Sequence, residues 1–158
     1  KKAPELAKPG IVVDSGGRVL GQHPGTAFFT VGQRKGLPAA SEPRYVLSTD
    51  PGTNTVVAGS KEETLASSLV AERAGWIIPA PDVPVRARVQ IRYRHVAAAA
   101  TVIPAEGGRV RVDFDQPQAA VTPGQPAVFY DEAGGQEVLG GGWIASPSAP
   151  PRPATATP

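Results

Sequence analysis

Residues 32–37 concentrate side chains that could bind an anion on a tight backbone frame. Gln33, Arg34 and Lys35 stand here between two glycines. Glycine lets a backbone approach a ligand closely, glutamine donates and accepts hydrogen bonds, and the two cations supply positive charge. Composition alone leaves two interpretations open, a decorated surface turn and an anion-binding loop.

A second basic stretch lies in a predicted strand. Residues 85–94 alternate strictly between apolar and polar side chains, and no acidic residue occurs between Asp82 and Glu106. Like charges on one strand face repel each other, whereas the planar guanidinium group grips phosphate and stacks on bases. We therefore favour nucleic-acid binding for the polar face. Tyr93 is either a base-stacking surface or a core residue. The four arginines of this face are Arg86, Arg88, Arg92 and Arg94.

Catalytic chemistry finds little support in the residue types. His23 and His95 lie far apart without metal-ligand spacing, and the chain has no cysteine for a thiolate nucleophile, a disulfide or a metal site. The turn at residues 15–17 superficially resembles an ATP-binding loop, but no amphipathic helix follows it, so a hairpin turn is favoured. Gln125 belongs to residues 122–125, which indicate only a turn. A self-sufficient enzyme is the least supported interpretation.

The composition and the distribution of glycine and proline predict β-structure. The 158 residues include 18 glycines and 18 prolines, which separate short valine-rich runs. We predict a linker over residues 1–8, a central β-rich domain over 9–73, a β-barrel over 74–145 and a disordered proline-rich tail over 146–158. Neither an apolar run of the roughly 20 residues that span a membrane nor a signal peptide is found, so we expect a cytoplasmic protein without a membrane partner.

The pattern also predicts individual elements. In the first unit we expect strands over residues 10–14, 18–22, 28–31, 45–47 and 55–58. Ser60 and Glu63 have the spacing of a capping box, which predicts one short helix from residue 61 to about 67. In the second unit, short strands with alternating faces indicate a small closed barrel or a sandwich. Their ranges are 85–93, 97–103, 109–114, 126–130 and 138–144.

Five motifs in one order give the chain a family resemblance. Over residues 10–144 it resembles the central and C-terminal parts of the bacterial tRNA-specific 2-thiouridylases, also called tRNA-uridine 2-sulfurtransferases. The motifs are Phe28-Phe29-Thr30-Val31-Gly32-Gln33-Arg34-Lys35-Gly36-Leu37, Arg92-Tyr93-Arg94, residues 114–125 ending in Thr122-Pro123-Gly124-Gln125, Val128-Phe129-Tyr130-Asp131 and Leu139-Gly140-Gly141-Gly142.

This resemblance implies part of a larger enzyme that thiolates the wobble uridine of tRNA at C2. In that family an N-terminal ATP-pyrophosphatase domain uses ATP with Mg²⁺ and carries the cysteines that pass sulfur, which a sulfur-carrier protein supplies. The implied fold of this chain is all-β. A small central domain with at most one short helix precedes a six-stranded barrel similar to one in elongation factors. The absence of cysteine fits a piece that lacks the catalytic domain, and we expect it to be inactive alone.

The resemblance further implies which residues meet tRNA. Arg92, Tyr93 and Gln125 correspond to contacts in the barrel, and we add Arg94 from the same motif. Gln33, Arg34 and Lys35 would lie near the active-site entrance and the anticodon arm. No catalytic, cofactor-binding or metal-binding residue is predicted here. The alternative function is an elongation-factor-like interaction module that binds no RNA.

Overall fold

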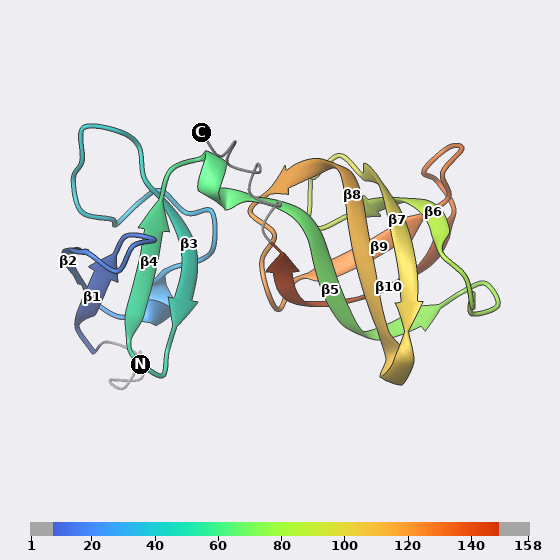
Figure 1. Cartoon of the computed structure of the whole chain (residues 1–158), viewed down its shortest axis with the longest axis horizontal. Coiled ribbons are helices and arrows are strands. Elements are labelled where there is room, and N and C mark those ends of the chain that lie inside the picture. Colours follow the sequence, from blue (N-terminus) through green and yellow to red (C-terminus); the bar gives the residue numbers. More distant parts are fainter. Residues whose placement is uncertain (1–7, 149–158) are drawn as a thin grey trace, which may run out of the picture. The chain divides into compact units, whose positions relative to one another are not determined.

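The computed structural model describes residues 8–148, which form strands, turns and short 3₁₀ segments (Figure 1). The all-β fold class is thereby confirmed. Contacts divide the chain into two compact units, Lys1–Thr64 and Leu65–Pro158. The predicted division after residue 73 is later than this one, because residues 65–76 form a single strand of the barrel. Residues 1–7 of the predicted linker lie outside the described residues.

The first unit is a four-stranded mixed sheet in the order β2-β1-β4-β3. β1 pairs antiparallel with β2 and parallel with β4, while β3 and β4 form an antiparallel pair. Its small core consists of Val12, Phe29, Val46, Val56 and Ala58. The strands are β1 (Gly10–Val13), β2 (Val19–His23), β3 (Tyr45–Asp50) and β4 (Thr55–Gly59).

The predicted strand at residues 28–31 is wrong. A 3₁₀ turn, η2 (Thr26–Phe28), occupies its start. The side-chain amide of Gln33 then donates to the Phe28 carbonyl, and its oxygen accepts from the Thr30 amide. These are backbone groups that a sheet ladder would need, so the segment closes into a loop instead.

The predicted helix after Ser60 is wrong, although its capping box forms. The Ser60 amide donates to Glu63 Oε2 at 2.7 Å, and the Glu63 amide donates to Ser60 Oγ at 3.4 Å. Only the 3₁₀ turn η3 (Glu62–Thr64) follows, because the next residues enter a long strand paired on both sides.

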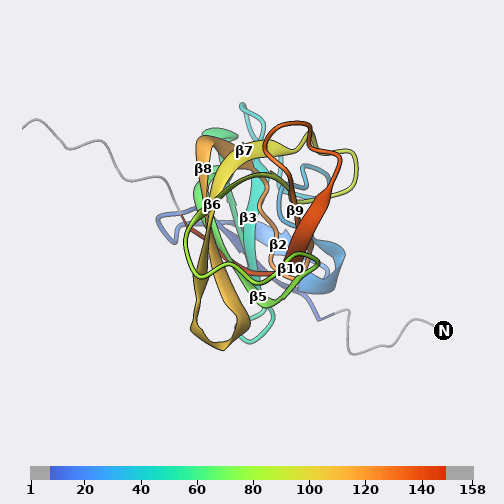
Figure 2. The ribbon, with the colours of Figure 1, turned by 90° about the vertical axis from the view of Figure 1, so that its right-hand side faces the viewer.

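The second unit is a closed six-stranded barrel in the order β10-β5-β8-β7-β6-β9 (Figures 1 and 2). Every neighbouring pair is antiparallel, and alternate side chains fill the interior, with Leu69, Phe129 and Ile144 among the largest. The six-stranded barrel expectation is confirmed. Its strands are β5 (Leu65–Trp76), β6 (Val85–Gln90), β7 (Ala98–Ala105), β8 (Arg109–Ala119), β9 (Pro126–Tyr130) and β10 (Val138–Ser148); the 3₁₀ turn η4 (Glu106–Gly108) joins β7 to β8.

Strand β10 departs from the sequence prediction at its end. It runs to Ser148, where the register pairs Ser146 with Val70 and Ser148 with Ser68. The predicted disordered tail therefore does not begin at residue 146, because these residues complete the barrel's hydrogen bonding to β5. The rest of that tail lies outside the described residues.

Candidate nucleic-acid interface

The three residues of the Arg-Tyr-Arg motif lie in a turn between β6 and β7. Strand β6 ends at Gln90, whose side-chain Nε2 donates to the His95 carbonyl at 2.8 Å. The His95 amide donates to the Arg92 carbonyl at 3.1 Å, and Arg94 adopts a left-handed φ of 62°. The expected strand to residue 93 is therefore too long. Tyr93 is 87% exposed, which excludes the core interpretation.

This turn is fastened to the end of β8. Arg92 Nη1 donates to the Ala119 carbonyl at 2.8 Å, and His95 Nε2 lies 3.0 Å from Gln118 Oε1. Because Gln118 uses its own Nε2 on the Gln116 carbonyl, its oxygen faces the ring, and the imidazole carries its proton on Nε2. The His95 ring therefore connects the turn to the end of β8.

The environment of His95 keeps the ring neutral. Burial lowers its pKa below the ordinary value against the opposing Gln118 bond, and the nearby Arg92 charge lowers it further. Among the described residues, the buried Nδ1 atom has no hydrogen-bond partner. A second proton there would have no acceptor, so the turn is held by a neutral imidazole at pH 7.

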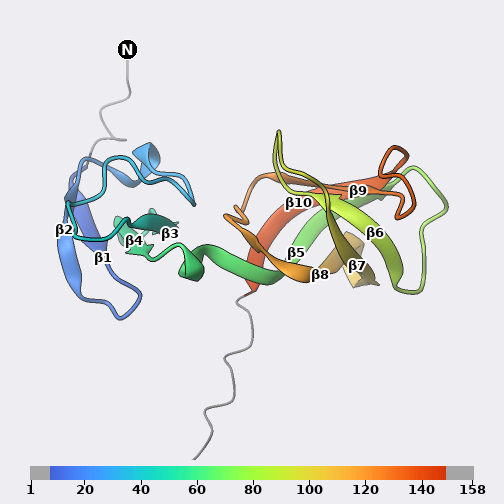
Figure 3. The ribbon, with the colours of Figure 1, turned by 90° about the horizontal axis from the view of Figure 1, so that it is seen from above.

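The exposed part of the turn pairs an aromatic ring with a cation. The guanidinium carbon of Arg94 lies 5.5 Å from the centroid of the Tyr93 ring. A cation over a ring face is attracted by the ring quadrupole, and exposed aromatic rings and guanidinium groups are side chains on which unpaired bases can stack. The connection between β6 and β7 that carries it stands out from the barrel in Figure 3.

Gln125 belongs to the same end of the barrel. Its amide donates to the Thr122 carbonyl at 3.2 Å and its carbonyl accepts from the Ile144 amide at 2.9 Å, so its backbone is fixed. Among residues 8–148 no hydrogen bond engages its exposed side-chain amide. The register Gln90↔Val128 places the start of β9 level with the chain just beyond β6. The structure therefore brings this glutamine and the Arg-Tyr-Arg turn to one rim.

The four-arginine face is only partly as predicted. Arg86 makes two hydrogen bonds to Asp115, at 2.8 and 2.7 Å, and a third to Glu132 at 3.1 Å. These partners, Asp115 first, raise the pKa of Arg86 and neutralise its charge locally. Arg88 only approaches the Ala97 carbonyl, at 3.4 Å. Arg86 is thus ion-paired, whereas Arg88, Arg92 and Arg94 have no carboxylate partner among the described residues.

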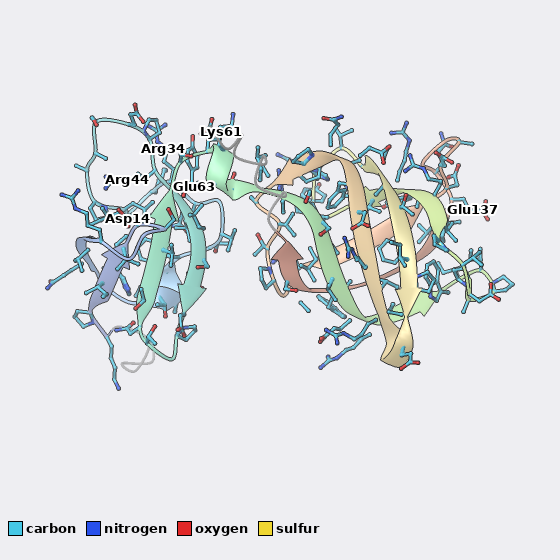
Figure 4. All side chains as sticks on the ribbon, in the orientation of Figure 1. Asp14, Arg34, Arg44, Lys61, Glu63 and Glu137 are labelled. Atoms are coloured by element: carbon cyan, nitrogen blue, oxygen red, sulfur yellow. The ribbon has the colours of Figure 1, made fainter. Side chains whose placement is uncertain are left out.

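The loop of residues 32–37 is held by its own glutamine. Gln33 Nε2 donates to the carbonyls of Phe28 and Lys35, at 3.2 and 2.8 Å. The Gly32 amide donates to the Val46 carbonyl, and the Val46 amide donates back to the Gln33 carbonyl. Both side-chain N–H groups of Gln33 are therefore engaged inside the loop. Its tip exposes the two cations, of which Arg34 is labelled in Figure 4.

Arg44 is a candidate site residue that the sequence pattern did not indicate. Arg44 is half-buried at the start of β3 and, among the described residues, makes neither a hydrogen bond nor an ion pair through its side chain. No local pattern marks it, because its neighbours Pro43 and Tyr45 indicate only the end of a loop.

Comparison with known proteins supplies the family. Residues 66–144 match the family described as the aminomethyltransferase beta-barrel domain, and residues 4–60 match the tRNA methyl transferase PRC-barrel domain. The chain is 50% identical over 139 residues to the tRNA-specific 2-thiouridylase MnmA of Trichormus variabilis. It is 48% identical over 139 residues to that of Nostoc punctiforme, and 47% over 137 residues to that of Syntrophotalea carbinolica.

The chain belongs to the tRNA-specific 2-thiouridylase family. The alignments cover 87% of this chain with the first two relatives and 86% with the third. They cover only 39%, 39% and 38% of the relatives' own lengths. The resemblance drawn from the motifs is confirmed. The gap between the two matched ranges, residues 61–65, contains the point between Thr64 and Leu65 at which contacts divide the chain.

The turn at residues 15–17 does not fit a nucleotide-binding loop. Asp14 Oδ1 accepts from the amides of Gly16 and Arg18, and the Gly17 amide donates to the Asp14 carbonyl. The amides that would hold a phosphate are thus used in a hairpin turn. Within residues 8–148 no three histidine, aspartate or glutamate side chains are placed to hold a metal ion. That part of the chain also lacks any helix of the length and apolarity needed to cross a membrane.

Proposed function

We propose that this chain is the RNA-holding part of a tRNA 2-thiouridylase. It would position the anticodon arm of tRNA so that the wobble uridine can be thiolated at C2. Family membership and the activity for which the relatives are named support the substrate class. Most of the relatives' length lies outside the match, and the chemistry of the reaction is assigned to that portion.

One observation carries the proposal: the barrel gathers Arg92, Tyr93, Arg94 and Gln125 at a single rim. Guanidinium groups bind phosphates, an exposed ring stacks on a base, and an unengaged amide both donates and accepts towards sugar or base edges. RNA recognition of unpaired segments uses this combination. Backbone hydrogen bonds hold Arg92 and Gln125, and the side chains of Tyr93, Arg94 and Gln125 are exposed.

Nucleotide and sulfur chemistry are placed elsewhere in this proposal. The turn at residues 15–17 does not fit ATP, so ATP, Mg²⁺ and the sulfur-carrier protein are assigned to the unmatched portion of the enzyme. The chain alone would bind tRNA in the cytoplasm without turning over ATP. Detectable ATP hydrolysis by the purified chain would contradict this assignment.

The test is a titration with a tRNA transcript at several salt concentrations, alongside a non-nucleic polyanion such as heparin. Each phosphate neutralised adds about 0.7–0.9 to the slope of log affinity against log salt. Replacing Arg92 and Arg94 together with alanine is expected to weaken tRNA binding and to flatten that slope by about 1.4–1.8. An unchanged slope would overturn the assignment of the rim.

Arg109 and Arg111 provide the matched control. Both are exposed on β8, and they pair with Glu72 and Asp113 at 3.6 and 2.7 Å. Their double alanine variant removes the same charge and should leave the slope near that of the wild type. Equal losses in both double variants would mean that net charge alone attracts RNA, which would favour the interaction module without specific RNA binding.

A further inference from the structure

The first unit contains a hollow with two arginines on its wall. It has a volume of about 310 Å³, formed by the chain that leads from the loop of residues 32–37 to β3. Arg34 and Arg44 line it, and most of its lining surface is polar. The apolar side chains of Leu37, Pro38 and Pro43 form a smaller part of the wall, called here the apolar backing. A volume of this size is at the lower end of small-ligand sites, about 300–1,000 Å³.

Both guanidinium groups are unsatisfied. Among the described residues, neither Arg34 nor Arg44 donates a side-chain hydrogen bond or lies within ion-pair distance of a carboxylate. Arg34 is exposed, but Arg44 is half-buried. Two arginine side chains that line one hollow without a carboxylate partner suit an anion from outside the chain.

A neighbouring hollow of about 330 Å³ is less suited to an anion. It shares Arg44, but its wall also carries Asp14 and Glu63. Their carboxylates are held by backbone amides, Asp14 by those of Gly16 and Arg18 and Glu63 by that of Ser60. This side repels anions. Figure 4 shows the labelled Asp14, Arg34, Arg44 and Glu63 gathered at one end of the small sheet.

We propose that the hollow between Arg34 and Arg44 binds one phosphodiester of the RNA substrate, with the adjoining nucleotide against the apolar backing. This inference rests on the proposed function, since it assumes that the chain binds RNA. Two guanidinium groups beside the side chains of Leu37 and the prolines suit a phosphodiester attached to a sugar and base. A free, strongly hydrated phosphate would gain nothing from Leu37 and the prolines. Glu42 lines both hollows and lowers the net positive charge around the two arginines.

The test uses the whole chain and a labelled anticodon stem-loop RNA. The variants are Arg34→Gln, Arg44→Gln and their combination, with Arg18→Gln as the matched control. Arg18 is exposed in the same unit but lines neither hollow. We expect each hollow variant to weaken binding about threefold to tenfold, as for partly exposed charge pairs, and the control to change it less than twofold.

The double variant tests whether both arginines hold the same phosphate. If both arginines hold one phosphodiester, the salt slope of the double variant should be only about 0.7 lower than that of the wild type. Its loss of RNA affinity should also be smaller than the product of the two single-variant losses. Arg44→Lys keeps the charge without the planar fork, so it should keep most of the slope and lose part of the affinity. An unchanged thermal midpoint shows that each variant is folded.

Four outcomes would overturn the inference. If Arg44→Gln behaves like Arg18→Gln while the Arg92 and Arg94 variants weaken binding, the hollow fails and the proposed function stands. If the wild type binds the stem-loop no more tightly than it binds heparin, both the hollow and the proposed function fail. Saturable binding of inorganic pyrophosphate that is abolished in Arg44→Gln, with RNA affinity unchanged, would assign the hollow to a free anion. Losses in the double variant that multiply, with a slope change of about 1.4, would exclude one shared phosphate.

Discussion

The side-chain amide of Gln33 makes three hydrogen bonds inside its own loop, whereas that of Gln125 makes none among the described residues. Both were predicted to contact tRNA from their motifs. The geometry separates them: Gln33 fixes the backbone that presents Arg34 and Lys35, and Gln125 offers an unengaged donor and acceptor. Their alanine variants should therefore have opposite consequences.

Gln33→Ala is expected to destabilise the first unit by about 1–2 kcal/mol, because three partly solvated hydrogen bonds are lost. Hydrogen exchange of the amides at residues 28–36 would report the loosening. Gln125→Ala should leave stability within about 0.5 kcal/mol of the wild type and weaken tRNA binding instead. A stable, fully protected loop in Gln33→Ala would contradict the bracing role.

Asp131 gives the barrel a defined response to acid. Its carboxylate accepts from the amides of Glu137, Gly134 and Gln136, at 2.8, 2.7 and 2.8 Å. These backbone bonds, Glu137 first, lower the pKa of Asp131 below its ordinary 3.8. A lowered pKa means that the charged form stabilises the fold above the unfolded-state value, and that this contribution is lost as the pH falls through the folded-state value.

Asp131→Asn should therefore lower the urea midpoint of the barrel more at pH 7 than at pH 3. The wild type loses the carboxylate's contribution below about 3.8, where the variant has nothing comparable to lose. Tryptophan fluorescence would follow the transition. An equal difference between the two proteins at both pH values would show that the charge of Asp131 is irrelevant.

The run of glycines in β10 is a requirement of that element rather than of any turn. Gly141 lies between β5 and β9, and a Cβ there would stand 2.7 Å from the Ala127 carbonyl oxygen. A Cβ on Gly142 would stand 2.9 Å from the Glu72 carbonyl oxygen. Strand β10 can therefore close the barrel only where these side chains are absent.

Gly141→Ala is expected to destabilise the barrel by about 1–3 kcal/mol, the usual cost of overpacking. Its direct partner in the register, Gly75, is the matched control, because a Cβ there would meet no atom within 4 Å. Gly75→Ala should change stability by no more than about 0.5 kcal/mol. Chemical unfolding of the two variants side by side checks this, and equal effects would contradict the close approach at Gly141.

Elements whose local pattern agrees with their pairing could be predicted from the sequence. The alternation through Val85, Ala87 and Val89 gives β6, and the matching pattern from Arg109 gives β8. The sequence pattern predicted the wrong element where a side chain makes hydrogen bonds to backbone groups. Gln33 diverts the expected strand at residues 28–31, and Gln90 with His95 ends β6 before Tyr93.

The candidate site shows the same limit. The types of Arg92, Tyr93 and Gln125 mark them in the sequence, but their meeting at one rim depends on the register of β6 with β9. The neutralisation of Arg86 by Asp115 and Glu132 depends on partners far away in the chain. A sequence pattern does not show which residues far apart in the chain come into contact. For this reason Arg86 seemed uncompensated in the sequence, although it is paired in the structure.

At the scale of the whole molecule, residues 8–148 form two separate cores. The barrel core holds fifteen buried residues, including Leu69, Val112 and Phe129, and the core of the first unit holds five. Because burial of apolar side chains is the main source of stability, we expect the first unit to have a lower free energy of unfolding than the barrel. Both tryptophans of the chain, Trp76 and Trp143, lie on barrel strands, so their fluorescence reports one unit alone.

Unfolding in urea should therefore occur in two steps, with the first unit lost before the barrel. Far-ultraviolet circular dichroism would show both transitions, whereas tryptophan fluorescence would show only the later one. Gly141→Ala should move the later transition and leave the earlier one in place. Coincident midpoints by both probes would contradict independent cores.

The central claim, that one rim of the barrel holds RNA, is tested most directly by chemical-shift mapping of the chain with an anticodon stem-loop. We predict that the shifted barrel amides concentrate in residues 91–97 and 120–125. The loops at the opposite strand ends, residues 77–84, 106–108 and 131–137, should not shift. Perturbations confined to those opposite loops, or none at saturating RNA, would contradict the account.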